Sequence, residues 1–206
     1  MIDLHDGRLM IGYHGTTESI AEDVLSLKSK LSKSNNDYDW LGSGIYFWEY
    51  NFERSWEWAE QATKANNKKT GRQDRPYVLG AIINLGRCLD LVSSDGLGHL
   101  VKAHENLKLI YAKSGDELPQ NTEQGGKFSW KRQLDCLVIN HFKSLLKENN
   151  VAPIDSVRGV FWEGKPLYEH SGFRTQNHIQ LAVEEKCIKG YFRPEEMRLK
   201  KEFKWN

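Results

Sequence analysis

The chain has 206 residues, and its 29 lysines and arginines nearly balance 28 aspartates and glutamates, giving a formal net charge of +1. This charge does not mark the whole chain as a nucleic-acid-binding protein. No stretch approaches the roughly 20 apolar residues that span a bilayer, and the charged first ten residues do not resemble a signal peptide. The composition therefore predicts one cytoplasmic domain over 1–206, with no membrane partner.

The three cysteines, Cys88, Cys136 and Cys187, are far apart in the sequence and odd in number. They form no disulfide framework, and no pair has the spacing of metal ligands. This usage favours a reducing compartment, and we expect no metal site.

An apolar run at 9–13 predicts a short strand, followed by a turn at 14–17 with the sequence His-Gly-Thr-Thr. Either threonine, Thr16 or Thr17, can cap a helix, because a hydroxyl accepts from the free amides of a first helical turn. Apolar residues at helical spacing predict that this helix covers about 18–27.

The most distinctive segment is 41–49, with the sequence Leu-Gly-Ser-Gly-Ile-Tyr-Phe-Trp-Glu. Its glycines let the backbone bend sharply, or let a ligand lie directly against it. The apolar run after them predicts a short buried strand with Tyr46 and Trp48 on one face and Ile45 and Phe47 on the other. One face can then present rings to a flat ligand, although an ordinary core strand has the same pattern.

Residues 52–66 predict a helix, because Phe52, Trp56, Ala59 and Thr63 share one helical face. We expect a polar loop over 64–75. This loop has a single acidic residue, Asp74, and five basic ones: Lys64, Lys68, Lys69, Arg72 and Arg75. Residues 77–92 predict two strands hinged at Gly86.

The second half of the chain alternates helical and strand patterns. Helical stripes at 97–113 and 134–146 flank a long polar loop over 114–127, and together they predict a helical insertion around 97–149. Strands are expected at 157–162, 178–183 and 187–192, with a loop over 164–177. Their irregular spacing excludes a doubly wound parallel sheet and favours an α+β fold with a mostly antiparallel sheet.

Three segments are found together, in this order, in one known family: Tyr13-His14-Gly15-Thr16, then Gly-Ser-Gly-Ile-Tyr-Phe at 42–47, then a helix with Ser55, Trp58 and Ala59. The chain resembles the ADP-ribosyltransferase superfamily in its poly-ADP-ribose-polymerase-like, His-Tyr-Glu branch. The resemblance covers the first 60 and last 50 residues, and it implies a split, mostly antiparallel sheet. Residues 93–150 have no counterpart and would be the helical insertion.

The sequence departs from that family at its last element, a strand that begins with a glutamate. The strand at 178–183 has no glutamate. His178 best fits the position by its offset from the next strand, whereas Gln180 is the better chemical substitute, because its amide can bond a ribose hydroxyl. Both residues share one face by period 2, and both remain candidates for the catalytic position.

The resemblance implies nicotinamide adenine dinucleotide (NAD) as co-substrate. The backbone of Gly15 would bond the nicotinamide carboxamide, Tyr46 and Trp58 would stack on its two sides, and His14 would bond a ribose hydroxyl on the adenosine side. The implied binding residues are His14, Gly15, Thr16, Tyr46, Phe47, Ser55 and Trp58, and the implied catalytic residues are His14, Tyr46, His178 and Gln180.

The missing glutamate predicts that each acceptor site receives at most one ADP-ribose, because in polymer-forming relatives this residue activates the acceptor hydroxyl. Glu163 or Glu169 can supply a base instead, although loop glutamates are most often only solvated. We therefore expect a mono-ADP-ribosyltransferase.

The acceptor is expected to be RNA, with protein as the other possibility. Basic clusters at 64–75 and 193–204, together with abundant aromatic residues, suit contacts with phosphates and unpaired bases. The chain also resembles small bacterial toxins and antiphage effectors of this superfamily, which implies a neutralising antitoxin or immunity protein. Two other functions stay open: an NAD glycohydrolase that uses water as acceptor, and a catalytically inactive module that binds NAD or ADP-ribose.

Overall fold

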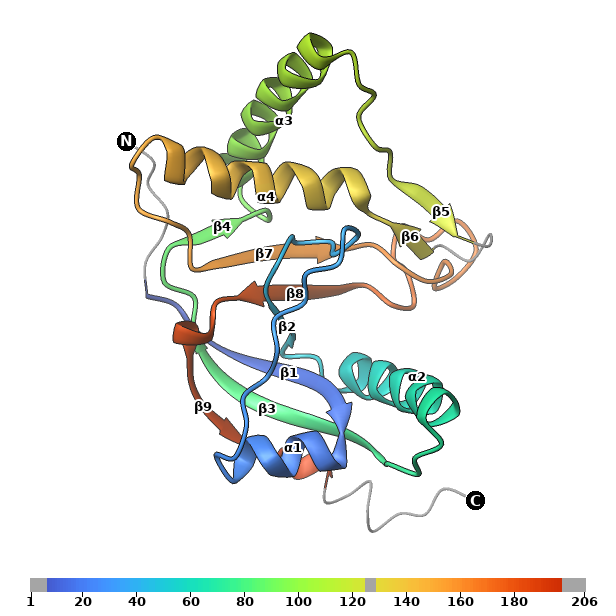
Figure 1. Ribbon diagram of the computed structural model, residues 1–206. Coiled ribbons are helices and arrows are strands. Elements are labelled where there is room, and N and C mark those ends of the chain that lie inside the picture. Colours follow the sequence, from blue (N-terminus) through green and yellow to red (C-terminus); the bar gives the residue numbers. More distant parts are fainter. Residues whose placement is uncertain (1–6, 125–128, 198–206) are drawn as a thin grey trace.

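In the computed structural model, which describes residues 7–124 and 129–197, the chain folds around a seven-stranded sheet in the order β4-β7-β8-β2-β1-β3-β9 (Figure 1). Neighbouring strands are antiparallel except β4 and β7, which are parallel. The strands are β1 (Leu9–Thr17), β2 (Ile45–Glu49), β3 (Pro76–Asn84), β4 (Cys88–Asp90), β7 (Ser156–Phe161), β8 (His178–Val183) and β9 (Ile188–Phe192). The predicted α+β class with a mostly antiparallel sheet is confirmed.

Five helices accompany the sheet in the described ranges. They are α1 (Glu18–Leu25), α2 (Phe52–Thr70), α3 (Ser94–Ser114), α4 (Gln133–Glu148) and the short 3-10 turn η1 (Glu185–Cys187). A separate two-stranded ribbon, β5 (Thr122–Gln124) with β6 (Ser129–Lys131), joins α3 to α4. The two helices predicted between 97 and 149 are therefore present as α3 and α4.

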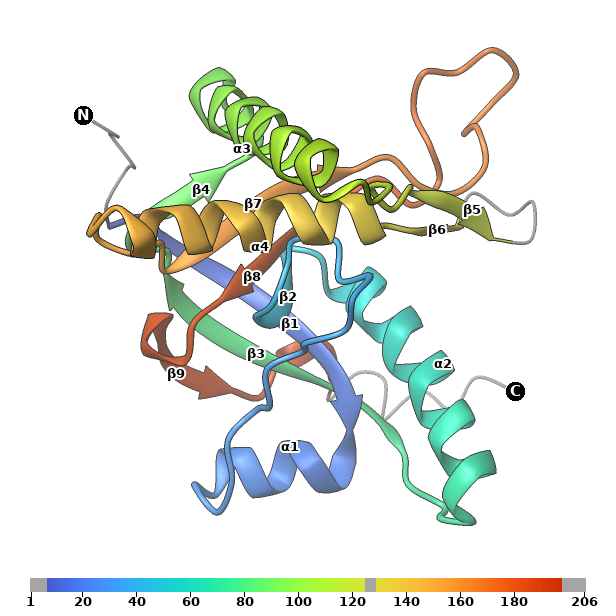
Figure 2. The ribbon, with the colours of Figure 1, turned by 45° about the horizontal axis from the view of Figure 1, so that its top comes forward.

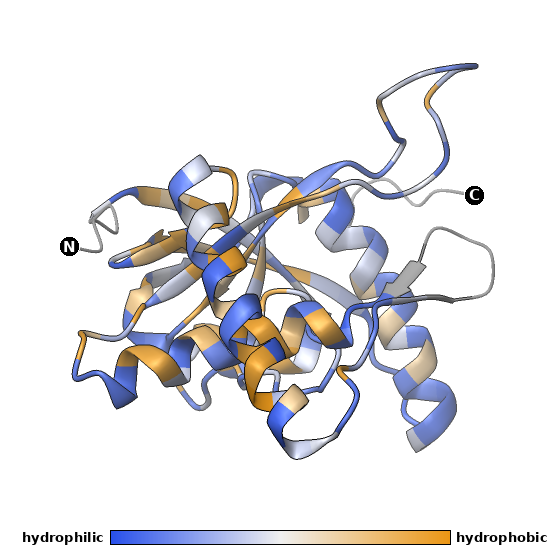
Figure 3. Ribbon diagram, turned by 90° about the horizontal axis from the view of Figure 1, so that it is seen from above, coloured by the Kyte–Doolittle hydropathy of each residue, from blue (hydrophilic) through white to orange (hydrophobic). Residues whose placement is uncertain are grey.

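The two faces of the sheet are covered by different helices. Tyr46, Ala182 and Val157 point to one face, where α3 and α4 pack over β4, β7 and β8. On the same face α2 lies over β1 and β3. The opposite face holds Phe47 and other core residues of β2, β3 and β8 under α1. Figure 3 shows the apolar and polar sides of the helices as orange and blue stripes.

Three expectations from the sequence are wrong at their boundaries. β1 continues through Thr17 instead of turning at His14, because the whole segment 9–17 pairs with β3. α2 runs to Thr70, so the expected loop over 64–75 shrinks to the residues after the helix, with Gly71 in the left-handed conformation as C-cap. The long loop after α3 ends in the strand β5. In contrast, Thr17 is the N-cap of α1 as the sequence predicts.

Helix α4 holds the glycine loop that precedes β2. Ser43 N–H donates to Asn140 Oδ1 at 3.0 Å, and Lys143 Nζ donates to the carbonyl of Ser43 at 2.7 Å. Gly42 has a positive φ of 70°, and a side chain there would collide with Asn140. The insertion therefore shapes the loop that leads into the strand carrying Tyr46.

A largely buried charge network ties three strands together on the face under α1. Arg158 of β7 makes a two-pronged ion pair with Glu49 of β2, at 2.6 and 2.8 Å. Its remaining nitrogen lies 3.3 Å from Asp90 of β4, which also accepts from Arg8 at 2.7 Å. The side chains of Arg158, Glu49 and Asp90 are 8–12% exposed.

No helix in residues 7–124 or 129–197 is long and apolar enough to cross a membrane. All three cysteines are buried and free.

Candidate functional site

The candidate site lies where β1 and β2 separate. The β1–β2 ladder pairs Gly12 with Glu49 and Tyr13 with Trp48 and does not continue to His14. Instead, the imidazole Nδ1 of His14 lies 2.8 Å from the carbonyl oxygen of Tyr46. Because a carbonyl only accepts, this nitrogen carries the proton and Nε2 keeps a lone pair. Burial lowers the pKa of His14, with the hydrogen bond to Tyr46 opposing it, so the ring is a neutral acceptor.

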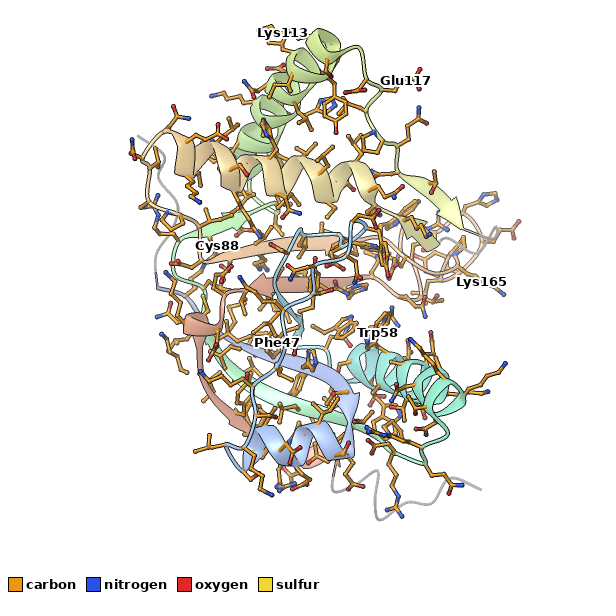
Figure 4. All side chains as sticks on the ribbon, in the orientation of Figure 1. Phe47, Trp58, Cys88, Lys113, Glu117 and Lys165 are labelled. Atoms are coloured by element: carbon orange, nitrogen blue, oxygen red, sulfur yellow. The ribbon has the colours of Figure 1, made fainter. Side chains whose placement is uncertain are left out.

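Gly15, the next residue, lies directly under helix α2. A Cβ atom added there would collide with the carbonyl oxygen of Ser55 and would lie 3.2 Å from the indole of Trp58. Trp58 is 52% exposed, and Figure 4 shows it at the end of α2 that faces the sheet. The expected neighbourhood of Gly15, Ser55 and Trp58 is therefore present, with an accessible aromatic ring at its edge.

A row of rings leads from Trp58 to the first residue of β8. The ring centroids of Trp58 and Trp48 are 6.0 Å apart, and those of Trp48 and His178 are 6.5 Å apart. His178 in turn stacks on Phe161 of β7 at 5.4 Å. The row is exposed at Trp58 and buried at Trp48 and His178, so its inner end is shielded from water.

Polar groups surround the Nδ1 side of His178. This nitrogen lies 2.7 Å from the carbonyl of Gln176 and 3.7 Å from a carboxylate oxygen of Glu163. Arg54 of α2 lies 3.4 Å from the same carboxylate and also pairs with Glu57. Burial raises the pKa of Glu163, and the nearby Arg54 opposes that shift.

Burial lowers the pKa of His178 to about 4, with Arg54 acting in the same direction and Gln176 and Glu57 opposing. A histidine in an unfolded chain has a pKa near 6.5. Between about pH 6.5 and pH 4 the unfolded chain therefore binds a proton at His178 that the folded protein does not bind. The stability that the folded protein gains from keeping His178 neutral is therefore fully present above about pH 6.5. It is lost as the pH falls toward 4, because protonation then favours the unfolded chain.

We therefore expect the free energy of unfolding to fall between pH 7 and pH 4.5 by about 2–3 kcal/mol more in the wild type than in His178→Gln. Urea unfolding at both pH values measures the difference, and comparing the two proteins cancels Glu163, His14 and other groups that titrate in both. Equal pH dependence in the two proteins would show that His178 is not buried as a neutral ring.

The predicted residues form two groups on opposite faces of the sheet. His14 pairs in register with Leu79 and contacts Phe47, so its ring faces the α1 side. Gly15, Trp58 and His178 face the α2 side. The two groups meet at the opening between β1 and β2, where His14 reaches the main chain of Tyr46.

Several predicted ligand contacts are not available in the structure. Phe47 is 0% exposed in the core, which excludes its ring from ligand contact. Ser55 is also fully buried, and its hydroxyl donates to the carbonyl of Phe52 at 2.9 Å. Thr16 is a buried strand residue. These three assignments rested on motif position, which does not show whether a side chain points inward.

Tyr46 is half-buried, and its hydroxyl is engaged with the glycine loop. It donates to the carbonyl of Gly42 at 2.7 Å and accepts from Leu41 N–H at 2.9 Å. Burial raises the pKa of this hydroxyl, so it stays protonated. The ring nearest Trp58 is that of Trp48 instead, which the sequence placed on the Tyr46 face without assigning it a role.

The remaining candidates differ in how close they lie to this row of rings. Gln180 pairs in register with Trp48 and is half-buried, whereas Glu169 is 89% exposed. Glu169 lies on the arm over 164–177, which extends away from the sheet (Figure 2). A hollow lined by Glu184, Glu185, Lys186 and Ile188 follows the far end of β8 and touches none of the predicted residues.

Sequence reasoning missed four residues that the fold brings to His178. Phe161, Arg54, Glu57 and Gln176 come from β7, α2 and the arm, and they lack any motif. Trp48 is a fifth residue without a predicted role, and it alone had a usable signal in the sequence, because period 2 places it on the same strand face as Tyr46.

In residues 7–124 and 129–197, no group of three or more histidine, cysteine, aspartate or glutamate side chains is arranged to hold a metal ion. No protein-family model, curated protein or solved structure matches the chain.

Proposed function

We propose that the protein is a mono-ADP-ribosyltransferase that transfers ADP-ribose from NAD to a macromolecule, with RNA as the favoured acceptor and protein as the alternative. The observation that carries the proposal is the convergence of four separate segments at the opening between β1 and β2. They contribute His14 and Gly15, Tyr46 and Trp48, Trp58, and His178. The first three of these are the segments on which the family resemblance rests, and the strand that carries His178 is where the sequence departs from the family.

The geometry suits an extended ligand with two halves. On the α2 face of the sheet, the exposed ring of Trp58 lies beside the backbone of Gly15, which has no side chain. This ring offers a stacking surface for a flat nicotinamide. On the other, the lone pair of His14 Nε2 can accept from a ribose hydroxyl. We expect a dinucleotide bound at the end of the β1–β2 ladder to contact both residues.

In the proposed reaction, the bond between ribose and nicotinamide breaks first. As this bond breaks, positive charge develops on the ribose, as in glycoside hydrolysis. Trp58 would hold the leaving ring, and the neutral histidines would orient hydroxyls without adding a positive charge next to the ribose. The absence of a carboxylate at the start of β8 is consistent with a single transfer to each site.

A cellular role as a bacterial toxin or antiphage effector follows from the same resemblance. An enzyme that modifies RNA or protein of its own cell requires a neutralising antitoxin or immunity protein. This part of the proposal predicts that expression of the wild type arrests growth, whereas a variant of His14 does not.

The direct test uses NAD labelled in its adenylate phosphate, incubated with the protein and a cell lysate. Label in macromolecules that ribonuclease removes and protease does not would support an RNA acceptor, and the reverse result would support a protein acceptor. Nicotinamide release without label would instead support an NAD glycohydrolase. Binding without turnover would leave a catalytically inactive NAD-binding module.

The basic end of α2 supplies a prediction for an RNA acceptor. Lys68 and Lys69 lie about 15 Å along the helix from Trp58, and with Arg72 they are exposed. Phosphate contacts supply much of the affinity for RNA, so the triple change to alanine is expected to lower RNA modification by about tenfold at physiological salt and to weaken the salt dependence of binding. NAD binding, measured by calorimetry, should stay unchanged.

A matched control removes three charges elsewhere: Lys102, Lys108 and Lys113 are exposed on α3. Their change to alanine should leave RNA modification near the wild-type rate. Equal losses in the two triple variants would show that only net charge matters, and loss of NAD binding in the first would place these residues at the nicotinamide pocket.

A further inference from the structure

One side of helix α4 carries a stripe of polar side chains: Gln133, Cys136, Asn140 and Lys143. They recur every three or four residues, so they share one side of the helix. Each of them bonds the loop over 36–43, which lies 96–100 residues earlier in the chain. The neighbouring side of α4 is apolar and packs into the core. The insertion is thus joined to this loop by directional bonds as well as by packing.

Three of these side chains form a continuous chain of hydrogen bonds with the main chain of the loop. The carbonyl of Asn36 only accepts, so the thiol of Cys136 donates to it at 3.4 Å. Burial raises the pKa of Cys136, so the thiol keeps that proton. The sulfur accepts from Asn140 Nδ2 at 3.4 Å, and Asn140 Oδ1 accepts from Ser43 N–H at 3.0 Å. Lys143 Nζ donates to the Ser43 carbonyl at 2.7 Å. Each bond has one donor and one acceptor, so the chain defines one arrangement of the loop.

The part of the loop that α4 holds is also the part that holds Tyr46. The hydroxyl of this tyrosine donates to the carbonyl of Gly42 at 2.7 Å and accepts from Leu41 N–H at 2.9 Å. Both anchors directly precede Ser43, which α4 grips from two sides. A tyrosine ring turns about two side-chain bonds, and a hydroxyl fixed at its far end limits both rotations. The hydrogen bonds from α4 therefore fix the plane of the Tyr46 ring.

We propose that α4 positions the ring of Tyr46 for the nicotinamide, and that Asn140 is the main residue through which it does so. This inference rests on the proposed function, in which Tyr46 and Trp58 lie on the two sides of the nicotinamide. Aromatic rings attract each other best in offset or edge-on arrangements, so a tilt of Tyr46 weakens its contact with this ring. Asn140 is a positioning residue, because it contacts the loop and not the ligand.

The experiment compares the affinities of the full chain for nicotinamide and for ADP-ribose, both measured by calorimetry. Asn140→Ala removes both hydrogen bonds of the amide. We expect the Kd for nicotinamide to rise about fivefold, whereas the Kd for ADP-ribose, which lacks that ring, stays within about twofold. A general weakening of the fold would raise both values together. The difference between the two ligands therefore separates positioning from structural support.

Cys136 offers a matched pair of variants. Cys136→Ala breaks the chain and should also weaken nicotinamide binding. Cys136→Ser can still donate to Asn36 and accept from Asn140, so it should restore the wild-type affinity. Gln133→Ala is a control on the same side of α4, because its partner at 2.8 Å is the side chain of Asp37 and not the main chain of the loop. This control should leave both affinities unchanged.

Tyr46→Phe tests whether the effect passes through the tyrosine hydroxyl. It removes the group that is anchored to the loop, so Asn140→Ala should have little further effect on nicotinamide binding in that background. Amide hydrogen exchange at Leu41 should be faster in Asn140→Ala than in the wild type, since this N–H donates to the hydroxyl. Thermal unfolding checks that each variant is folded, and if Asn140→Ala is not, the two Cys136 variants carry the test.

Three results would overturn the inference. They are wild-type nicotinamide affinity in folded Asn140→Ala, equal losses of affinity for nicotinamide and ADP-ribose, and effects of Asn140→Ala and Tyr46→Phe that simply add. A wild-type protein that binds neither ligand is a separate result, since it removes the proposed function itself and the inference with it.

Discussion

Replacing His14 with alanine is expected to lower the rate of ADP-ribose transfer by about tenfold or more, equivalent to roughly 1.4 kcal/mol at the barrier. The change removes an imidazole whose Nδ1 is fixed by the carbonyl of Tyr46 and whose Nε2 is then directed as a hydrogen-bond acceptor. In the proposed complex, the ribose on the adenosine side would lose its hydrogen-bond partner, and the dinucleotide would be held less precisely.

The matched control is His141→Ala. His141 is also hydrogen-bonded through its ring, to Asn106 at 2.8 Å, but it is a half-buried residue of α4 and its bond joins that helix to α3. Nicotinamide release and labelled transfer should be unchanged in this variant. NAD should also raise the melting temperature of the wild type more than that of His14→Ala, because a ligand stabilises the state that it binds. Wild-type rates in His14→Ala would remove the residue from the site.

The largest expected effect on stability belongs to Arg158→Met, which should lower the free energy of unfolding by about 3–5 kcal/mol. Arg158 is 12% exposed and pairs with Glu49 and Asp90, which are equally buried. Removing the guanidinium leaves Glu49 without its two-pronged partner, and an unpaired buried carboxylate is costly. Urea unfolding at pH 7 measures the loss.

Arg193→Met provides the comparison, because it breaks a pair of the same chemistry at the surface. Arg193 and Glu22 are 54% and 45% exposed, and such pairs contribute about 0–1 kcal/mol. Losses of similar size in the two variants would show that the network on β7 is solvated in solution and does not tie the strands together.

The core strands could be predicted because their residues alternate or form short apolar runs, as at 45–48. The ends of elements could not. His14 to Thr17 are polar or small and suggested a turn, yet they continue β1, because β3 provides a partner strand up to Pro76. The end of α2 has no apolar stripe, but Lys68 and Lys69 are good helix formers.

Long-range contacts also extend α2. The side chain of Asn67 bonds the backbone of Asp74 in both directions, at 2.8 and 3.1 Å, and Gly71 supplies the left-handed cap. Such contacts join residues that do not belong to one helical repeat. A prediction from periodicity therefore ends the helix too early.

The candidate site could be predicted in its segments but not in its side chains. Motif spacing selected strands and a helix that are neighbours in the structure, since Gly15 lies against Trp58 and the ring of Trp48 lies between Trp58 and His178. It did not reveal that Phe47 and Ser55 point inward, or that Trp48 is the ring beside Trp58. These facts depend on strand register and on the rotation of α2 about its axis, which are set by packing over the whole sheet.

The place of β8 in the sheet has a consequence for the order in which the protein becomes active. β8 inserts between β2 and β7, although about 130 residues separate it from β2 along the chain. During synthesis β1, β2 and β3 can pair early, because contacts close in sequence form fastest. The sheet closes only when β8 leaves the ribosome, and His178 arrives with it. The row of rings from Trp58 to His178 therefore cannot form on a nascent chain until β8 has been made.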